Sequence, residues 1–424
     1  MVVASVFVTQ SICYGIYYSF SVFFVALLGE FGWSRAPTAG VFSVLVLVIG
    51  LGGVVSGALI DRFGASKVLP TGAILMSLGL AAASQLSELW QFYLYFGLVF
   101  GLGFSLTGWV PCVAVLSRWF SGRLGLATGV ASAGMGLGIV AMVPFSEYLI
   151  VGFGWRSAYL IIAGVALLGI APQSAFLLVA RPDESGLEPD AVSVSSISDP
   201  SGPTSHNREL LVVDQEWTSR PWSVATAIRT SRFWLLAGYM VLTPLTSQIL
   251  WVHQVAYLVD GGYDKVLAAA VAGLVGLASM PAKTVWGVAG DRLGREVAHT
   301  AGAGITILAI FLLVLAKAFP ALLLVLLFAV TFGIGYAVAA PLQPTVVADV
   351  FGGRNFGAIY GVLSIGVGVG SALGPWLGGY IFDATGSYLL AFELAAASIG
   401  ASAACVWFAS PRKIRRISRS QTCR

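Results

Sequence analysis

The sequence predicts an all-α membrane protein with twelve transmembrane helices, arranged as two six-helix bundles related by a pseudo-two-fold axis. Three observations support this prediction. The 424 residues are 58% hydrophobic and 10% charged, with a mean hydropathy of +0.89, so too little polar surface remains to cover a soluble core of this size. Long apolar runs occur twelve times. A short motif after the second run recurs after the eighth.

Each apolar run has the length that a bilayer demands. A helix needs about 20 apolar residues to cross a hydrocarbon core of about 30 Å. The runs are continuous and rich in Leu, Ala and Gly, without the alternation of polar and apolar residues seen in barrel strands, which favours helices. We expect spans near residues 3-28, 37-60, 69-86, 90-116, 123-148, 156-179, 233-259, 266-290, 298-316, 321-346, 353-380 and 388-409.

Composition divides the chain into four parts. We expect an N-terminal six-helix bundle over 1-180, a cytoplasmic linker rich in Pro, Ser, Asp and Glu over 181-222, a C-terminal bundle over 223-410 and a basic tail over 411-424. Residues 217-232, with two Trp, are either a segment along the membrane interface or a plain connector. The first span lacks the basic start and cleavage site of a signal peptide, so we interpret it as a retained span.

Basic residues gather in alternate connections, and this asymmetry predicts the orientation. One side holds most of the Lys and Arg, and the other holds only Arg35, Arg156, Lys265 and Lys317. We therefore expect both termini and the linker to be cytoplasmic, in a multi-pass protein of the plasma membrane. The net charge of +4 follows from this topology and does not indicate nucleic-acid binding. We expect the basic tail to contact anionic membrane lipid.

The residue pattern does not indicate cofactor binding or enzymatic activity. The four cysteines show no paired spacing, so we expect neither a disulfide framework nor a metal site. The chain has no recognisable nucleotide-binding loop and no ordered pair of nucleophile and base. We expect no cofactor and no enzymatic activity.

The two halves of the sequence repeat each other. Residues 57–64 (GALIDRFG) recur as residues 287–294 (GVAGDRLG), at an offset of 230. At nearly the same offset, Phe120 and Arg123 at the start of the fifth span match Phe351 and Arg354 at the start of the eleventh. A parallel repeat of six plus six spans is typical of a carrier that rocks two bundles about a central site.

These motifs resemble those of a known family. The repeated Gly-x-x-x-Asp-Arg-x-Gly loop resembles the signature loop of the major facilitator superfamily. Residues 14–24 (YGIYYSFSVFF) and 119–134 (WFSGRLGLATGVASAG) are similar to monocarboxylate transporter-like members, although the acidic, Gly- and Trp-rich motif expected before the first span is absent. The resemblance covers the whole chain and implies the major facilitator fold, with transport of small monocarboxylates such as lactate or pyruvate together with a proton.

The carboxylates of the repeated loops, Asp61 and Asp291, are candidate inner-gate residues. A carboxylate at the cytoplasmic end of span two can meet the positive N-terminus of span eleven, so we expect Asp61 to face residues 352–355 and, by symmetry, Asp291 to face residues 122–125. The alternative is that these charged loops only fix topology. The arginines of the candidate inner gate are Arg62, Arg123, Arg292, Arg295 and Arg354.

Lys283 is the candidate substrate anchor, because it is the only Lys or Arg inside a long apolar segment. A charge at a helix centre costs about 2.5 to 3.5 kcal/mol, which demands a partner or a wet cavity; the alternative is a Lys that snorkels to the interface. By the resemblance, Lys283 stands eight residues before Asp291, where related carriers place an Arg that pairs with the substrate carboxylate. Ser279 stands where many relatives carry an Asp that shares the proton.

Other polar and aromatic residues complete the predicted site. Tyr14, Tyr17 and Tyr18 are expected to donate hydroxyl groups to the substrate, with aromatic packing as the alternative. His253 is either an outer-gate or proton-uptake residue, or a neutral histidine bonded to a neighbouring helix. Further residues expected to line the pore and bind substrate are Gln248, Trp251, Gln254 and Gln343.

The residues thus predict a secondary transporter for a small organic monoanion, since one buried cation matches one negative charge. Two alternatives remain open. One is an exchanger of organic anions or an exporter of larger organic solutes, and the other is a membrane sensor that keeps the carrier fold without transporting.

Overall fold

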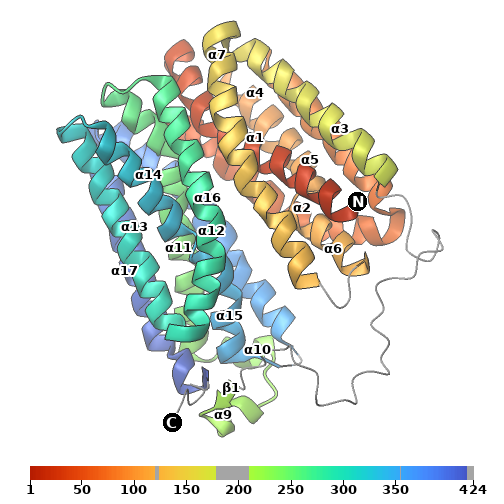
Figure 1. The fold of residues 1–424 in the computed structure, drawn as a ribbon, viewed down its shortest axis with the longest axis vertical. Coiled ribbons are helices and arrows are strands. Elements are labelled where there is room, and N and C mark those ends of the chain that lie inside the picture. Colours follow the sequence, from red (N-terminus) through yellow and green to blue (C-terminus); the bar gives the residue numbers. More distant parts are fainter. Residues whose placement is uncertain (120–123, 178–209, 354, 418–424) are drawn as a thin grey trace, which may run out of the picture. The chain divides into compact units, whose positions relative to one another are not determined.

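The computed structural model describes residues 1–119, 124–177, 210–353 and 355–417 (Figure 1). These residues form two compact units. Unit 1 holds Met1–Gly202, Trp251–Gly276 and Phe382–Ala384, and unit 2 holds Pro203–Leu250, Leu277–Ile381 and Thr385–Arg424. Within the described ranges, eleven helices are long and apolar enough to cross a membrane. The prediction of a multi-pass helical membrane protein is confirmed, whereas the domain bounds drawn from composition stay a prediction.

Unit 1 is built from the first half of the chain. Its helices are α1 (Val2–Phe31), α2 (Arg35–Phe63), α3 (Ala65–Ala83), α4 (Leu89–Phe92), the π-helical η1 (Tyr93–Phe100), α5 (Gly101–Thr107), α6 (Trp109–Trp119) and α7 (Leu124–Leu177). Gly154 interrupts α7 with φ 78° and ψ 157°, so α7 carries both the fifth and the sixth expected spans. This merger accounts for eleven long helices where the sequence predicts twelve spans.

Unit 2 contains most of the second half. Its helices are α9 (Gln215–Ser219), α10 (Val224–Ala227), α11 (Ser231–Asp260), α12 (Lys265–Leu293), α13 (Arg295–Ala318), α14 (Leu322–Tyr336), α15 (Ala339–Phe351), α16 (Phe356–Thr385), α17 (Leu389–Ala409) and the 3₁₀ turn η3 (Pro411–Lys413). The last turns of α11, the first part of α12 and three residues of α16 belong to unit 1. Strands β1 (Leu210–Val212) and β2 (Arg415–Ile417) pair antiparallel, a small departure from the all-α prediction.

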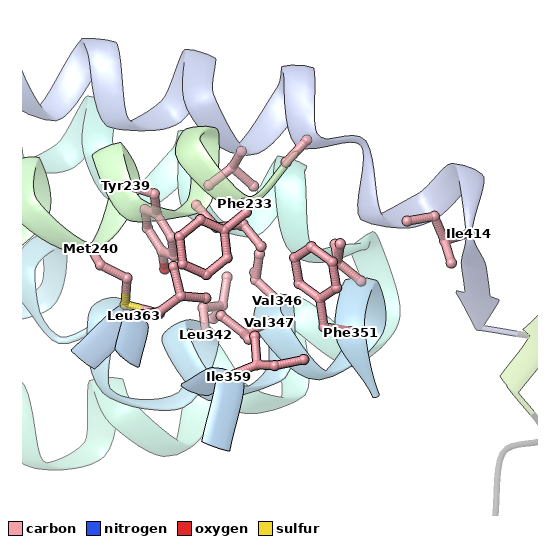
Figure 2. Packing of buried hydrophobic residues seen from close by; sticks show 14 of the residues in the cluster. Phe233, Tyr239, Met240, Leu342, Val346, Val347, Phe351, Ile359, Leu363 and Ile414 are labelled. Carbon is pink, nitrogen blue, oxygen red and sulfur yellow. The ribbon is translucent and has the colours of Figure 1, made fainter. Parts of the chain in front are cut away.

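The core of unit 2 is a continuous cluster of apolar side chains (Figure 2). Phe233, Tyr239 and Met240 of α11 pack beside Leu342, Val346, Val347 and Phe351 of α15, with Ile359 and Leu363 of α16 completing the cluster. Ile414, which follows η3, is fully buried and belongs to the same cluster. The segment after α17 is therefore part of the folded unit.

The sequence repeat reappears in the packing of the helices. In unit 1, a Cβ added at Gly138 of α7 would collide with the carbonyl oxygen of Ser11 on α1. In unit 2, a Cβ at Gly370 of α16 would collide with the carbonyl oxygen of Val241 on α11. Ser11 and Val241 are separated by the same 230 residues as the two loops. Spans one and five, and spans seven and eleven, thus pack backbone to backbone through glycine, as membrane helices often do.

The repeat also includes a broken helix in each half. The fourth expected span is interrupted at Gly108, between α5 and α6, and the tenth at residues 337–338, between α14 and α15. The offset between the two breaks is again close to 230. In unit 1, the side-chain Nε2 of the fully buried Gln10 donates to the carbonyl oxygens of Thr107 at 3.3 Å and Gly108 at 3.1 Å. This amide replaces helical hydrogen bonds that the break removes.

Candidate functional site

Lys283 lies in α12 of unit 2 and is half-buried. It stands ten residues before Leu293, where α12 ends, which corresponds to about 15 Å of helix at 1.5 Å per residue. That depth exceeds the several ångströms that a lysine stem can reach, which disfavours snorkelling to the end of the helix. Among the described residues, Lys283 has no salt bridge or hydrogen bond. Its ammonium is available to an anion.

Ser279 lies one turn before Lys283 on the same helix and is fully buried. It shares a side-chain hydrogen bond with Tyr336 at the end of α14. The position at which relatives of the resembled family carry a proton-sharing Asp is therefore occupied by a neutral hydroxyl with its own partner. Lys283 consequently has no carboxylate one turn away on its helix.

The surface of α12 that follows Lys283 is hollowed. A pocket of about 390 Å³ runs along the next two to three turns, toward the end of the helix. It is lined by Thr284, Val285, Val288, Ala289, Arg292 and Leu293. Lys283 precedes this pocket along α12 and is not among the residues that line it.

The three tyrosines of α1 form one aromatic cluster in unit 1. The ring centroids of Tyr17 and Tyr18 lie 4.9 Å apart, and Tyr14 lies 6.0 Å from Tyr17. Tyr18 packs against Trp251 of α11, with centroids 4.3 Å apart, and Phe104 of α5 lies beside Tyr14 at 5.3 Å. The structure thus brings together four of the predicted substrate residues.

The remaining predicted pore residues differ in how well their polar groups are satisfied. Gln254 of α11 is fully buried in unit 1, and neither its amide nitrogen nor its amide oxygen has a hydrogen-bond partner in the described part of the chain. His253 is also fully buried and meets the ring of Phe24 edge-on at 5.5 Å. In unit 2, Gln248 is buried and Gln343 is half-buried.

The second repeated loop forms a charged network within unit 2. Arg295 Nη1 lies 2.6 Å from Asp291 Oδ1, and Arg295 Nε lies 3.2 Å from Asp349 Oδ2 of α15. Arg292 is exposed. Asp291 therefore pairs with an arginine of its own unit, whereas the predicted partner Arg123 lies outside the described residues.

The first repeated loop is described less fully. Arg62 is exposed, and its guanidinium lies 5.1 Å from the ring of Phe63. The side chain of Asp61 and the whole of Arg354 lie outside the described structure. The inner-gate contacts expected for Asp61 stay a prediction.

A charged cluster that the sequence did not predict lies in unit 1, at the end that carries Phe31, Gly154 and Asp260, called here the Arg35 end. The guanidinium of Arg35 binds the Asp260 carboxylate at 2.7 and 3.0 Å and lies 3.7 Å from the ring centre of Phe382. The Asp383 carboxylate accepts the backbone N–H of Arg35 at 2.9 Å and of Ala36 at 2.7 Å. The first residues of α2 are thereby fixed to the ends of α11 and α16.

Two buried titratable residues were also missed. Glu147 of α7 is 3% exposed, whereas Glu393, which also lies near the end of an apolar run, is exposed. His299 of α13 is fully buried, and its Nε2 lies 3.0 Å from Ser402 Oγ of α17. Its position at the start of an apolar segment was the available signal. Within the described ranges, no group of three or more His, Cys, Asp and Glu is placed to hold a metal ion.

The last residues of the linker and the first residues of the tail both pack on unit 2. Trp217 donates its Nε1–H to the Val350 carbonyl oxygen at 2.8 Å, and Trp222 packs edge-on against Phe351 at 5.2 Å. The buried Glu296 accepts the backbone N–H of Arg412 at 3.0 Å. Both tryptophans therefore contact the protein, and the first residues of the tail are folded.

Two repeated sets of spans, glycine-mediated helix pairs and paired helix breaks define a polytopic membrane protein of the two-bundle facilitator class. A family model for the Major Facilitator Superfamily matches residues 6–315 and 262–422. The chain belongs to this superfamily and, within it, is monocarboxylate transporter-like. This confirms the resemblance and the twelve-helix fold predicted from the motifs.

Individual relatives are similar over nearly the whole chain. Monocarboxylate transporter 13 of Bos taurus is 30% identical over 400 residues, covering 94% of this chain and 86% of that protein. Monocarboxylate transporter 3 of Rattus norvegicus is 29% identical over 404 residues, covering 94% and 77%. Among solved structures, a bacterial homolog of the human lysosomal transporter Spinster, inward-facing and unoccupied, has a TM-score of 0.70 at 15% identity and covers 97% of both chains. At that identity the likeness shows the fold alone.

Proposed function

We propose that this protein is a secondary transporter of small monocarboxylates, coupled to protons, in which Lys283 anchors the substrate carboxylate. The observation that carries the proposal is a lysine in the interior of α12 that has no anionic partner among the described residues. The names of the relatives, which are monocarboxylate transporters, support the same substrate class. One cation favours a monoanion over a dianion, because a second carboxylate would be left without a counter-charge.

The proposed cycle follows from the cost of moving charge. With no substrate, the ammonium of Lys283 needs water, and closing the cavity would strip that water away. A bound carboxylate neutralises the ammonium, so the loaded site crosses between outward-facing and inward-facing states at a lower electrostatic cost. In this scheme the aromatic cluster of Tyr14, Tyr17, Tyr18 and Trp251 supplies apolar walls and hydroxyl donors.

The Arg35 end fits the outer side of the proposed carrier. Arg35, Arg156 and Lys265 are three of the few basic residues on the side that the charge asymmetry assigns to the exterior. We therefore propose that Asp260, Asp383 and Arg35 form an outer gate, and that the network of Asp291, Arg295 and Asp349 contributes to the inner gate.

Counterflow in proteoliposomes tests the function. Vesicles loaded with unlabelled lactate are expected to accumulate labelled lactate or pyruvate, and an inward proton gradient is expected to increase net uptake. Counterflow without any effect of the gradient would favour the exchanger of organic anions, for which the neutral Ser279 beside Lys283 is the supporting observation. The absence of counterflow with every small carboxylate would overturn transport and favour a sensor.

The anchor itself is tested by substitution. Lys283→Gln is expected to abolish counterflow, because it removes the charge, whereas Lys283→Arg keeps part of it. Lys67→Gln is the matched control, since Lys67 is an exposed lysine at the start of α3. Equal activity of the two Lys283 variants would contradict the assignment.

A further inference from the structure

Glu147 is a carboxyl group inside unit 1 that the proposed transport site does not use. It is 3% exposed, and its Oε1 has no hydrogen-bond partner. In the described part of the chain, Glu147 forms no salt bridge and no hydrogen bond. Ser146 is buried beside it, whereas Phe145 and Tyr148 are exposed. The Glu147 side chain therefore lies almost entirely inside unit 1.

The contact between α7 and α12 shows which surface covers Glu147. Gly276 of α12 lies against Ile139, and Gly273 lies 3.2 Å from Pro144, in each case measured from a Cβ built on the glycine. Pro144 and Glu147 are three residues apart and thus share a face of α7. The contacts run in opposite sequence directions, because Ile139 meets Gly276 and the later Pro144 meets the earlier Gly273. Glu147 follows Pro144 by three residues, which places it against α12 about one turn before Gly273.

The charged groups near Glu147 do not compensate its burial. Lys265 and Asp264, at the start of α12, act on it with opposite signs. From α1, the hydroxyl of Ser19 accepts a hydrogen bond from Ser146 at 2.9 Å, and Glu30 is paired with Arg156. The other charged or titratable groups at this end are Arg35, Tyr159, His253, Asp260 and Asp383, and among the described residues none hydrogen-bonds Glu147.

An ionised Glu147 would lack a hydrogen-bond donor among the described residues, and the attraction of Lys265 would be opposed by the repulsion of Asp264. Desolvating an isolated charge is so costly that such a group takes up a proton and becomes neutral. A neutral carboxylic acid also loses hydrogen bonds on burial, but at a far smaller cost. The packed arrangement of α7 against α12 is therefore compatible with protonated Glu147 and opposed to ionised Glu147.

We propose that Glu147 is a proton-binding site that controls closure of the Arg35 end. When α7 and α12 separate, water reaches the carboxyl and the proton leaves to solvent as the carboxylate forms; when they pack, the carboxylate takes up one proton from solvent. Acid on that side thus favours the packed state. This inference rests on the proposed alternating access, but it does not depend on which substrate is carried or on Lys283.

Spin-label distances between α7 and α12 test the proposal. Nitroxides on cysteines that replace Tyr148 and Val266, both exposed in the structure, report the separation in proteoliposomes without substrate. The packed population is expected to grow as the pH falls from 8 to 5, because uptake of a single proton changes the packed-to-open ratio by up to about tenfold per pH unit. A ratio that does not respond to pH would overturn the proposal.

Variants of Glu147 assign the response to this carboxyl. Glu147→Gln, which is permanently neutral, is expected to stay packed at every pH, and Glu147→Asp is expected to keep the response because it keeps a carboxyl. Glu393→Gln, in which an exposed glutamate of α17 is neutralised, is the matched control and is expected to behave like the parent. A Glu147→Gln variant that still responds to pH, or that opens, would refute the role. The spin-label experiment contains no substrate, so its result can be interpreted even if the lactate counterflow experiment fails.

Discussion

Removing the Asp383 carboxylate is expected to loosen the Arg35 end without unfolding the protein. Asp383 of α16 accepts two backbone N–H groups at the start of α2, at 2.9 and 2.7 Å. It therefore caps a helix to which it does not belong. When the Arg35 end opens and α2 moves away from α16, these hydrogen bonds are lost, so Asp383→Ala penalises only the closed state.

The size of the effect follows from the type of contact. Replacing a capping side chain by Ala costs about 0.5–2 kcal/mol, and the carboxylate at a helix N-terminus adds about 0.3–1 kcal/mol of dipole energy. The Arg35–Asp260 pair, with side chains 16% and 29% exposed, remains in the variant. We therefore expect a shift of about 1–2 kcal/mol, which is about a 5- to 30-fold change in the ratio of closed to open molecules.

A buried position on the same face of α2 reports the shift. Ala39 is fully buried and lies one turn beyond Arg35, so a cysteine there reacts with a membrane-impermeant maleimide only when the Arg35 end opens. Asp383→Ala is expected to accelerate labelling by the factor given above. The matched control is Asp214→Ala, since Asp214 of unit 2 caps its own helix, α9, through the backbone N–H of Trp217 at 2.9 Å. Equal labelling in the two variants would refute the gate.

Two further predictions concern stability and the tail. Gly138→Ala is expected to destabilise the protein by about 1–3 kcal/mol, because the added Cβ would collide with the Ser11 backbone. Gly164→Ala is the control and is expected to be neutral, since Gly164 lies on the same helix with open space around it. Equal melting temperatures of the two variants in detergent would contradict this packing. Glu296→Ala is expected to release the segment after α17, since it removes the carboxylate that accepts the Arg412 backbone N–H, and faster protease cleavage after residue 410 would show it. Glu216→Ala, which removes only an exposed pair, is expected to leave cleavage unchanged.

Residue patterns were sufficient to predict those features whose physical cause lies within one short stretch of the chain. The apolar runs, the repeated Asp-Arg loops and the depth of Lys283 each depend on a stretch of one helix, and the structure has helices in all these places. Tyr14, Tyr17 and Tyr18 share an aromatic cluster because residues three and four apart lie on one face of α1.

The Arg35 cluster could not be predicted, because its partners are distant along the chain. Arg35 is 225 residues from Asp260 and 348 residues from Asp383. Glu147 and Glu393 are alike in sequence, each a single carboxylate near a helix end, and only packing makes one buried and the other exposed. The break at Gly108 was missed because the apolar run through it is continuous, while its stabilising amide, Gln10, is 98 residues away.

The pairing of β1 with β2 has a consequence for biosynthesis. β1 lies within the predicted linker, and β2 follows α17, so all of the helices α11 to α17 stand between the two strands in the chain. During translation, the β1 strand and the helices α11 to α17 leave the ribosome first, and the partner strand becomes available only after α17. The hydrogen bonds between the two strands, and the burial of Ile414 that precedes β2, are therefore late events. An expression tag fused directly after β2 would delay or block this last step, and a tag at the N-terminus avoids the problem.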